Sequence, residues 1–358
     1  MPRITVAIAT GRGIDDTHYY KWMRIRRAFL DRELQSKHLN GEFGALLAAV
    51  LDEKLDYHIE YQIRALEKGT RAPDRIIIVD RVKEDLGGME YYGGEGRDII
   101  VAPMMSAREL ELMPASALSG PLDRRSNKVS MGCSDKNTAI ALCETEYLLM
   151  LDDCCLPGFG LVEAAYRACE AGHILLVGHQ QMYVEEALEW SDTKIEVSQA
   201  NWTTALDEYT VDAAKENRRV FGVWAMPLSH ALAVNGFNTR LDGDRGGLDL
   251  ELLERMDRYA TATGLEYEVS PNARIYEIGH DHPWAPKKET NSDEAWREHL
   301  PAGWDFKAPG PALKDIRRDA GIVVGGDIFD LASHAETVER DEVIGEILES
   351  FDGVEDDE

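Results

Sequence analysis

The chain has 358 residues, 44% of them hydrophobic and 29% charged, a balance that supports a sizeable core and excludes disorder except at the ends. Its 66 acidic and 39 basic residues give a formal net charge of -27, which repels phosphate backbones and argues against binding of duplex nucleic acid. The acid excess is spread along the whole chain. Two interpretations of it stay open, namely adaptation to high salt and an ordinary acidic protein of the cytoplasm.

The cysteines and the first residues bear on the cellular compartment. Neighbouring cysteines at 154 and 155 could hardly bridge each other without strain, and an odd total without a spaced framework favours reduced thiols in a cytoplasm; the five are Cys133, Cys143, Cys154, Cys155 and Cys169. The start "MPRITVAIATGRG" lacks the build of a signal peptide. No apolar run approaches the roughly 18 residues of a membrane span. We expect a cytoplasmic protein without a transmembrane segment, and leave peripheral membrane contact open.

The first third of the chain predicts strands around a helical insertion. Residues 3–10, "RITVAIAT", form a β-branched apolar run that predicts a buried parallel strand. Helical spacing follows over residues 19–69, as two helices or as one that breaks near residue 40. Residues 72–81, "APDRIIIVDR", predict a second strand that ends at Asp80, and residues 97–103 a further one.

The middle and the last third continue this alternation. The pattern predicts helices over residues 134–146 and 160–172 and over about 249–263, and strands over residues 147–151, 173–179 and 267–280. Residues 185–219 are polar and are predicted to be partly helical, and the tail from about residue 334 is acidic. Strands that alternate with helices predict an α/β fold with a mainly parallel, Rossmann-type sheet flanked by helices.

Carboxylates stand where two predicted strands end. Asp80 follows the second strand, and the vicinal pair Asp152 and Asp153 follows "YLLML". Ligands of such sheets gather outside the carboxyl ends of the strands, so these acids are expected to face one crevice. Vicinal carboxylates repel each other unless a cation relieves them, and a hard ion such as Mg²⁺ or Mn²⁺ takes oxygen ligands. The alternative is an acid pair that caps a helix or faces solvent.

The segment "SDKNTAIALCETEYLLMLDDCCLP" (134–157) resembles, nearly position for position, the central segment of family 2 glycosyltransferases of the GT-A fold. The strands "VAIAT" and "IIIVD" and the later "NGFNTRLDGDRGGLDLELLERM" (235–256) resemble other segments of that family, in the same order. The resemblance covers residues 3–285. It implies a GT-A-like catalytic domain over residues 1–285, with a helical insertion at 19–69, a nucleotide-sugar-binding part at 72–158 and an acceptor-side part at 159–285. Residues 286–358 would form a C-terminal extension with an acidic tail.

The resemblance implies an inverting glycosyltransferase that moves a sugar from a nucleotide-diphosphate donor, with a UDP-sugar favoured, to a hydroxyl of a glycan, lipid-linked sugar or protein. Asp249 would be the catalytic base, and Mn²⁺ or Mg²⁺ the cofactor. The residues that the resemblance places on the nucleotide-sugar are Thr10, Asp80, Lys136, Asn137 and Asp152. Those that it places on the metal are Asp153 and one of His280 and His282, and those near the acceptor are Gly247 and Trp284.

Two positions depart from the family pattern. Cys154 stands where the family has the last acid of its metal motif, and a thiol is a poor ligand for hard ions. Leu248 stands where the family has an acid that contacts acceptor. Asp249 could alternatively cap a helix, and Trp284 could belong to the core. Two other functions therefore stay open: a nucleotidyltransferase on a similar sheet, and a non-catalytic protein that binds a sugar nucleotide or a partner.

Overall fold

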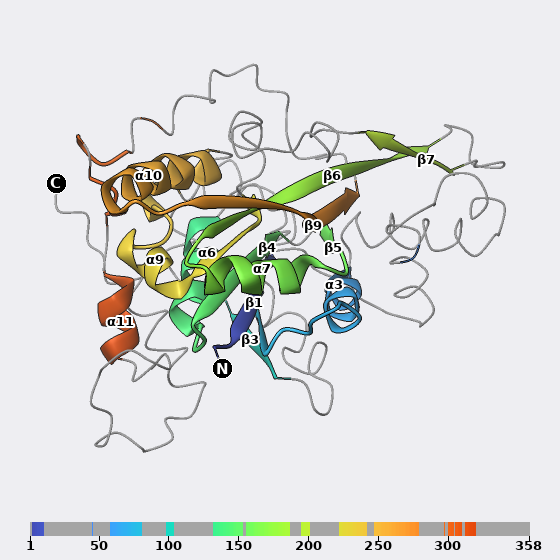
Figure 1. The fold of residues 1–358 in the computed structure, drawn as a ribbon, viewed down its shortest axis with the longest axis horizontal. Helices are drawn as coiled ribbons and strands as arrows, with labels where there is room; N and C mark the ends of the chain where they lie inside the picture. Colours follow the sequence, from blue (N-terminus) through green and yellow to red (C-terminus); the bar gives the residue numbers. More distant parts are fainter. Residues whose placement is uncertain are drawn as a thin grey trace, which may run out of the picture.

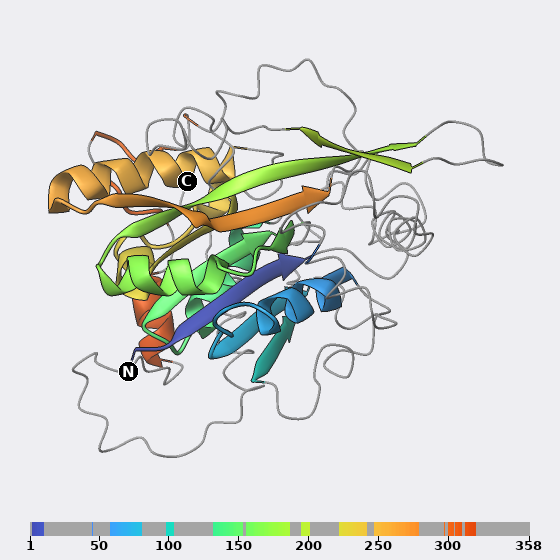
Figure 2. The same ribbon diagram turned by 45° about the vertical axis from the view of Figure 1, so that its right-hand side comes forward.

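A computed structural model of the chain (Figures 1 and 2) describes part of it, in segments that contain all the elements discussed below. These segments are residues 2–10, 45, 58–80, 98–103, 132–152, 155–186, 195–200, 222–241, 247–278, 297, 300–303, 305–309 and 312–319.

One mixed sheet forms the centre of the described part (Figure 1). Its strands are β1 (Ile4–Thr10), β2 (Arg75–Asp80), β3 (Ile99–Pro103), β4 (Tyr147–Asp152), β5 (Cys155–Pro157), β6 (Ile174–Glu186), β7 (Ile195–Ala200), β8 (Trp224–Pro227) and β9 (Tyr267–Ile278). They are ordered β3-β2-β1-β4-β8-β6-β9-β5, with β7 paired to β6. Pairing directions make β1, β2, β3, β4, β6 and β9 point one way and β5, β7 and β8 the other, so six of the nine described strands share one direction.

Helices cover both faces of the sheet, because strand residues alternate between two buried clusters. In β4, Leu148 and Met150 join the cluster beneath α6 (Gly132–Leu142), α9 (Leu228–Ala233), α10 (Leu248–Thr263) and α11 (Leu313–Asp319). Leu149 and Leu151 of the same strand join the opposite cluster, beneath α3 (His58–Glu67) and α7 (Leu161–Glu170). A strand buried on both faces reads as the continuous apolar run seen in the sequence. The predicted class, an α/β fold with a mainly parallel sheet flanked by helices, is confirmed.

One predicted region contains two stretches of strand that were not expected. Residues 185–219 were expected to be polar and partly helical; β6 extends to Glu186 and Ile195–Ala200 form β7, which pairs antiparallel with β6, while the rest of this range lies outside the described residues. In "IEVSQA" Ile195 and Val197 alternate with Glu196 and Ser198, a period of two that favours a strand. The polar composition of the surrounding stretch obscured this short alternation. Helix α3 lies within the expected insertion 19–69, most of which is outside the described residues.

The C-terminal part packs onto the same core. Leu313 of α11 is a member of the cluster beneath α6, and Phe306 packs against it. Ala308 donates a backbone hydrogen bond to the carbonyl of Val234, 2.9 Å away. The described residues between 300 and 319 therefore pack against elements of the unit that the sequence assigned to 1–285. Among the described residues, no helix combines the length and the apolar character needed to cross a membrane.

Candidate active site at the strand ends

Adjacent parallel strands bring three of the predicted site positions to one edge of the sheet. Thr10 at the end of β1 is in register with Asp80 at the end of β2, and Ala9 is in register with Asp152 at the end of β4. These are the carboxyl ends of the strands, where ligands of such sheets bind. The backbones of Thr10 and Asp80 are placed, whereas their side chains lie outside the described part. The strand order β2-β1-β4 is what unites these positions, which lie up to 142 positions apart in the chain.

A lysine ammonium joins two of the predicted acids. Lys136 Nζ lies 3.0 Å from Asp249 Oδ1 and 3.5 Å from Asp152 Oδ1. The side chain of Lys136 is 7% exposed, whereas those of Asp152 and Asp249 are 49% and 32% exposed. The ammonium therefore lies behind two carboxylates that water or a ligand can reach. We call these three residues the strand-end cluster.

The charge state of Lys136 follows from this surrounding. Burial alone lowers the pKa of an ammonium, but the charges of Asp249 and Asp152 and the hydrogen bond to Asp249 outweigh it, so the pKa of Lys136 is raised above its ordinary value. The lysine is thus a fixed positive charge at neutral pH. Two carboxylates and one ammonium leave the strand-end cluster with a net charge of about -1.

Lys136 belongs to a buried polar row at the start of α6. The row Asp135 to Thr138 at its start is polar and yet at most 6% exposed. Asn137 satisfies both ends of its amide on one residue: its Nδ2 donates to the carbonyl of Phe237 at 2.8 Å, and its Oδ1 accepts from the amide of Phe237 at 2.7 Å. The prediction that Asn137 contacts a nucleotide stays untested, while in the described structure its amide already binds the backbone of Phe237.

The turn that carries Phe237 depends on a glycine. Gly236 has a φ of 59°, in the left-handed region, and a Cβ built there would clash with Asn137 Oδ1 and with Leu313. The close approach lets the backbone of Phe237 meet the Asn137 amide. The "NGF" triplet is therefore a local structure that locks onto α6.

The end of β4 is held by groups that the sequence did not single out. Gln62 of α3 donates from Nε2 to the carbonyls of Asp152 at 2.7 Å and Cys155 at 2.5 Å. The thiol of Cys155 also donates to the Asp152 carbonyl, at 3.0 Å. Gly222 lies so close to the Asp152 carboxylate that a Cβ there would clash with Oδ2. The backbone of Asp152 is thus held by Gln62 and Cys155, and its carboxylate is confined by Gly222.

Asp249 stands in the first turn of α10 and is not its cap. The N-cap is Gly247, whose φ of 85° suits glycine, and no side chain makes a cap hydrogen bond there. The Asp249 carboxylate points instead to Lys136. Leu248, where the family resemblance has an acid, packs against the core cluster beneath α6. The alternative of Asp249 as a capping residue therefore has no support in this geometry.

The remaining predicted site residues, Asp153, Cys154, His280, His282 and Trp284, lie outside the described part. Within the described ranges, no three His, Cys, Asp or Glu side chains form a group suited to a metal ion. Asp152 and Asp249 direct an oxygen each to Lys136, so the described residues alone do not make a metal site. Four described cysteines, at 133, 143, 155 and 169, are buried, and none of these four is in a disulfide.

Other buried residues were missed because their partners are remote in sequence. Arg317 of α11 donates to the carbonyls of Ile140, Ala141 and Cys143 at 3.2, 2.6 and 2.6 Å, and so satisfies the end of α6. A buried pair, Glu251 and Arg255, lies at helical i,i+4 spacing in α10. That spacing is visible in the sequence, but it more often marks an exposed pair.

No protein-family model and no curated protein matches the chain. Among solved structures, one match is a crystal structure of GalNAc-T7 with UDP, GalNAc and Mn²⁺, 12% identical, with a TM-score of 0.40, over 78% of this chain and 44% of that one. Another is a crystal structure of S. aureus TarS 1-349, 12% identical, with a TM-score of 0.39, over 77% of this chain and 60% of that one. The chain thus spans less than two thirds of either structure. Likeness at this level establishes no family, and the fold described above rests on its own strand order.

Proposed function

We propose that this protein is an inverting glycosyltransferase, which moves a sugar from a nucleotide-diphosphate donor, with a UDP-sugar favoured, to a hydroxyl acceptor. The observation that carries the proposal is the strand-end cluster: Lys136 lies within 3.5 Å of both the donor-side acid Asp152 and the base Asp249. These three residues occupy matching positions in the segments that resemble family 2 glycosyltransferases. Segments separated by 113 residues thus supply one site.

The reaction would be a single displacement. The acceptor oxygen forms a bond to the anomeric carbon while the bond from that carbon to the diphosphate oxygen breaks, and the nucleoside diphosphate leaves with the electron pair. Asp249 takes the proton of the acceptor hydroxyl, and a base positioned in this way contributes about 10²–10⁴-fold to the rate. Its carboxylate is 32% exposed, which gives a hydroxyl access to it.

Lys136 would stabilise the departing diphosphate. Its ammonium is buried and charged behind the two carboxylates, so a donor that takes the place of one of them would meet it, and a fixed donor at a developing negative charge is typically worth about 10²–10³-fold in rate. Because the cluster carries a net negative charge, the donor also needs further positive charge to enter. The proposed Mn²⁺ or Mg²⁺ would supply it, with Asp153 and one of His280 and His282 as ligands. Thr10, Asp80 and Asn137 would contact the nucleotide, and Gly247 and Trp284 the acceptor.

The test combines a donor screen with one variant. UDP-glucose, UDP-galactose, UDP-N-acetylglucosamine and GDP-mannose are each added with Mn²⁺ while the midpoint of thermal unfolding and the release of nucleoside diphosphate are measured. We expect one donor to raise the midpoint and to be turned over. Asp249→Asn should keep the shift and lose about 10²–10⁴-fold in kcat. Glu254→Gln on the exposed side of the same helix is the matched control and should change neither.

Three outcomes separate the alternatives. A midpoint shift without turnover in the wild type would favour the non-catalytic sugar-nucleotide binder. Turnover that survives Asp249→Asn would remove this residue as the base. If a nucleoside triphosphate and a sugar phosphate are converted to a nucleotide sugar, while no nucleotide sugar is consumed, the protein is a nucleotidyltransferase.

A further inference from the structure

The buried face of α10 carries an ion pair that solvent does not reach. Arg255 Nε lies 2.7 Å from Glu251 Oε1, and both side chains are 0% exposed. Burying such a pair removes two charges from water, and the cost of that desolvation often exceeds what the pair gains. A buried pair is therefore weak evidence for stability and calls for another role. Its contacts indicate which role that is.

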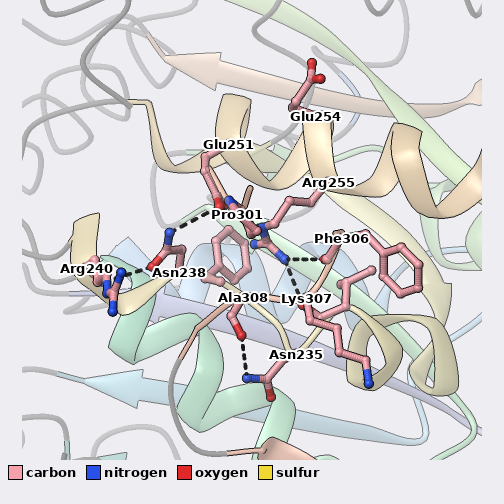
Figure 3. Close-up of polar contacts among 12 residues, drawn as sticks. Asn235, Asn238, Arg240, Glu251, Glu254, Arg255, Pro301, Phe306, Lys307 and Ala308 are labelled. Carbon is pink, nitrogen blue, oxygen red and sulfur yellow. Dashed lines mark hydrogen bonds and ion pairs between the residues drawn. The ribbon is translucent and has the colours of Figure 1, made fainter. Parts of the chain in front are cut away.

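Arg255 joins three separate segments of the chain (Figure 3). Its Nη1 donates to the carbonyls of Val234 at 2.8 Å and Phe306 at 3.3 Å, and its Nη2 to the carbonyl of Gly236 at 2.7 Å. With Glu251 on Nε, the planar guanidinium has partners in several directions. Arg255 thereby ties α10 to the turn before Phe237 and to the C-terminal segment around Phe306.

Glu251 holds the other side of the same turn. Its Oε1 accepts from Asn238 Nδ2 at 3.2 Å as well as from Arg255, while its Oε2 is buried without a hydrogen-bond partner among the described residues (Figure 3). Asn238 in turn accepts from the amide of Arg240 at 3.1 Å. An unsatisfied carboxylate oxygen in the core is costly, so the pair is again weak evidence for stability.

The pair lies close to the proposed base along the helix and close to its partner through space. Glu251 is two residues after Asp249, so the two side chains leave α10 in different directions, one to the core and one to Lys136. Asn238 follows Phe237, whose backbone is gripped by Asn137, the neighbour of Lys136 on α6. Hydrogen bonds between Glu251 and Asn238, between Phe237 and Asn137 and between Lys136 and Asp249 thus join residues that are otherwise near neighbours along the chain, and together they link the start of α10 to α6.

We propose that Glu251 and Arg255 are positioning residues, which fix the first turn of α10 against α6 so that Asp249 meets Lys136. We call Glu251, Arg255 and the backbone carbonyls of Val234, Gly236 and Phe306 that Arg255 binds the clamp. The inference about position rests on these contacts alone. Its consequence for catalysis rests on the proposed function.

The test replaces the pair with apolar side chains that can fill the space, in Glu251→Leu/Arg255→Met. The chain offers a matched control in α7: Arg167 Nε also lies 2.7 Å from Glu163 Oε1 at i,i+4 spacing, but the side chains are 73% and 31% exposed, and α7 packs on the opposite face of the sheet from α10. Glu163→Leu/Arg167→Met therefore makes the same chemical change without touching the clamp. Circular dichroism verifies that each variant is folded.

The first readout needs no activity. The protein is labelled with ¹³C-lysine, the Lys136 signal is assigned by its loss in Lys136→Arg, and it is followed from pH 8 to about pH 11, where ordinary lysines lose their proton. In the wild type Lys136 should stay protonated, because Asp249 and Asp152 raise its pKa. In Glu251→Leu/Arg255→Met it should lose its proton within this range, because burial persists while Asp249 moves away. The control should behave as the wild type does.

The second readout is kinetic and uses whichever donor the screen identifies. The clamp variant should lose about tenfold or more in kcat with little change in the donor KM, as expected when a base is misplaced by a fraction of an ångström. A folded clamp variant in which Lys136 titrates as in the wild type would overturn the proposal. If that variant does not fold, Asn238→Ala, which cuts the link at Glu251 and keeps the ion pair, decides by the same titration. Absence of transferase activity would count against the proposed function only.

Discussion

The strand-end cluster and the Glu251–Arg255 pair use the same chemistry in opposite surroundings. In both, a nearly inaccessible cation meets a carboxylate at about 3 Å: 3.0 Å for Lys136 to Asp249 and 2.7 Å for Arg255 to Glu251. The acids of the strand-end cluster are a third to a half exposed, whereas Glu251 is fully buried. Exposed carboxylates can exchange their lysine for a ligand at modest cost. The buried carboxylate has nothing to exchange, so it can only hold position.

The largest expected difference between the two clusters is in the free energy of unfolding. Arg255→Ala leaves Glu251 charged in the core, and breaking a buried pair from one side costs about 3–5 kcal/mol. Lys136→Ala leaves two carboxylates that water can reach, so its cost should be about 1 kcal/mol. Urea denaturation at neutral pH measures both free energies of unfolding. Equal losses in the two variants would break the distinction drawn between the clusters.

The next effect concerns function in the strand-end cluster. Lys136→Met removes the proposed charge opposite the diphosphate and should lower kcat for the identified donor by about 10²-fold, in the range seen when one fixed donor is lost. Arg255→Lys, which retains the charge but loses the planar fork, should lower stability and should lower kcat by a smaller factor of about tenfold, because Asp249 is then less well positioned. Steady-state kinetics on variants verified as folded separates these results. A Lys136→Met enzyme with unaltered kcat would exclude a catalytic role for the lysine.

A pH dependence of stability should also distinguish the cluster. The pKa of Lys136 is raised in the folded protein above the ordinary 10.5, so its ammonium contributes stability in full below about pH 10.5, and this contribution is lost as the pH rises through the folded value. The free energy of unfolding of the wild type should therefore fall more steeply above pH 10.5 than that of Lys136→Met. Denaturation series at successive pH values provide the slopes. Parallel slopes would show that Lys136 carries no such coupling.

The smallest effect is expected from a glycine. Gly222→Ala places a Cβ against the Asp152 carboxylate, which is half-exposed and can rotate away from Lys136. Donor affinity should fall by about 1 kcal/mol, roughly fivefold, with little change in stability. In an Asp152→Ala background the same substitution should have no further effect on affinity, because the carboxylate it displaces is absent. An undiminished effect in that background would mean that Gly222 acts on something other than Asp152.

Six strands of the sheet could be predicted because their signals are local, whereas β5, β7 and β8 were not predicted. The apolar run at 147–151 required a strand buried on both faces, and the helical spacing from about 249 to 263 matched α10 within one residue. β7 was missed because its alternation spans six residues inside a polar stretch. Helix α6 ends at Leu142, before the expected 146, because Thr145 turns the chain: its hydroxyl donates to the hydroxyl of Thr5 in β1 at 2.8 Å.

The site could be predicted only in part, for a related reason. Strand ends and the family resemblance singled out Asp152, Asp249 and Lys136, and these three lie together. That Lys136 bridges the two acids depends on a contact across 113 residues, which no periodicity encodes. Asn137 was expected near a nucleotide because the family resemblance places it there, and that its amide binds Phe237 could not be foreseen, since the two lie 100 residues apart. The contacts of Lys136 with Asp249 and of Asn137 with Phe237 depend on how α6 packs against remote segments, and the sequence pattern alone does not predict that packing.

The hydrogen bonds from Arg317 to the end of α6 bear on the order in which parts of the protein can fold during synthesis. The carbonyls of Ile140, Ala141 and Cys143 await a donor that lies 174 to 177 residues further along. A nascent chain emerges from the ribosome at about 5–20 residues per second, so these groups stay without Arg317 for about 10–35 s. During that interval water must solvate the end of α6. The end of α6 therefore gains its described hydrogen bonds only after residue 317 has been synthesised, and a chain cut short before that position would lack them.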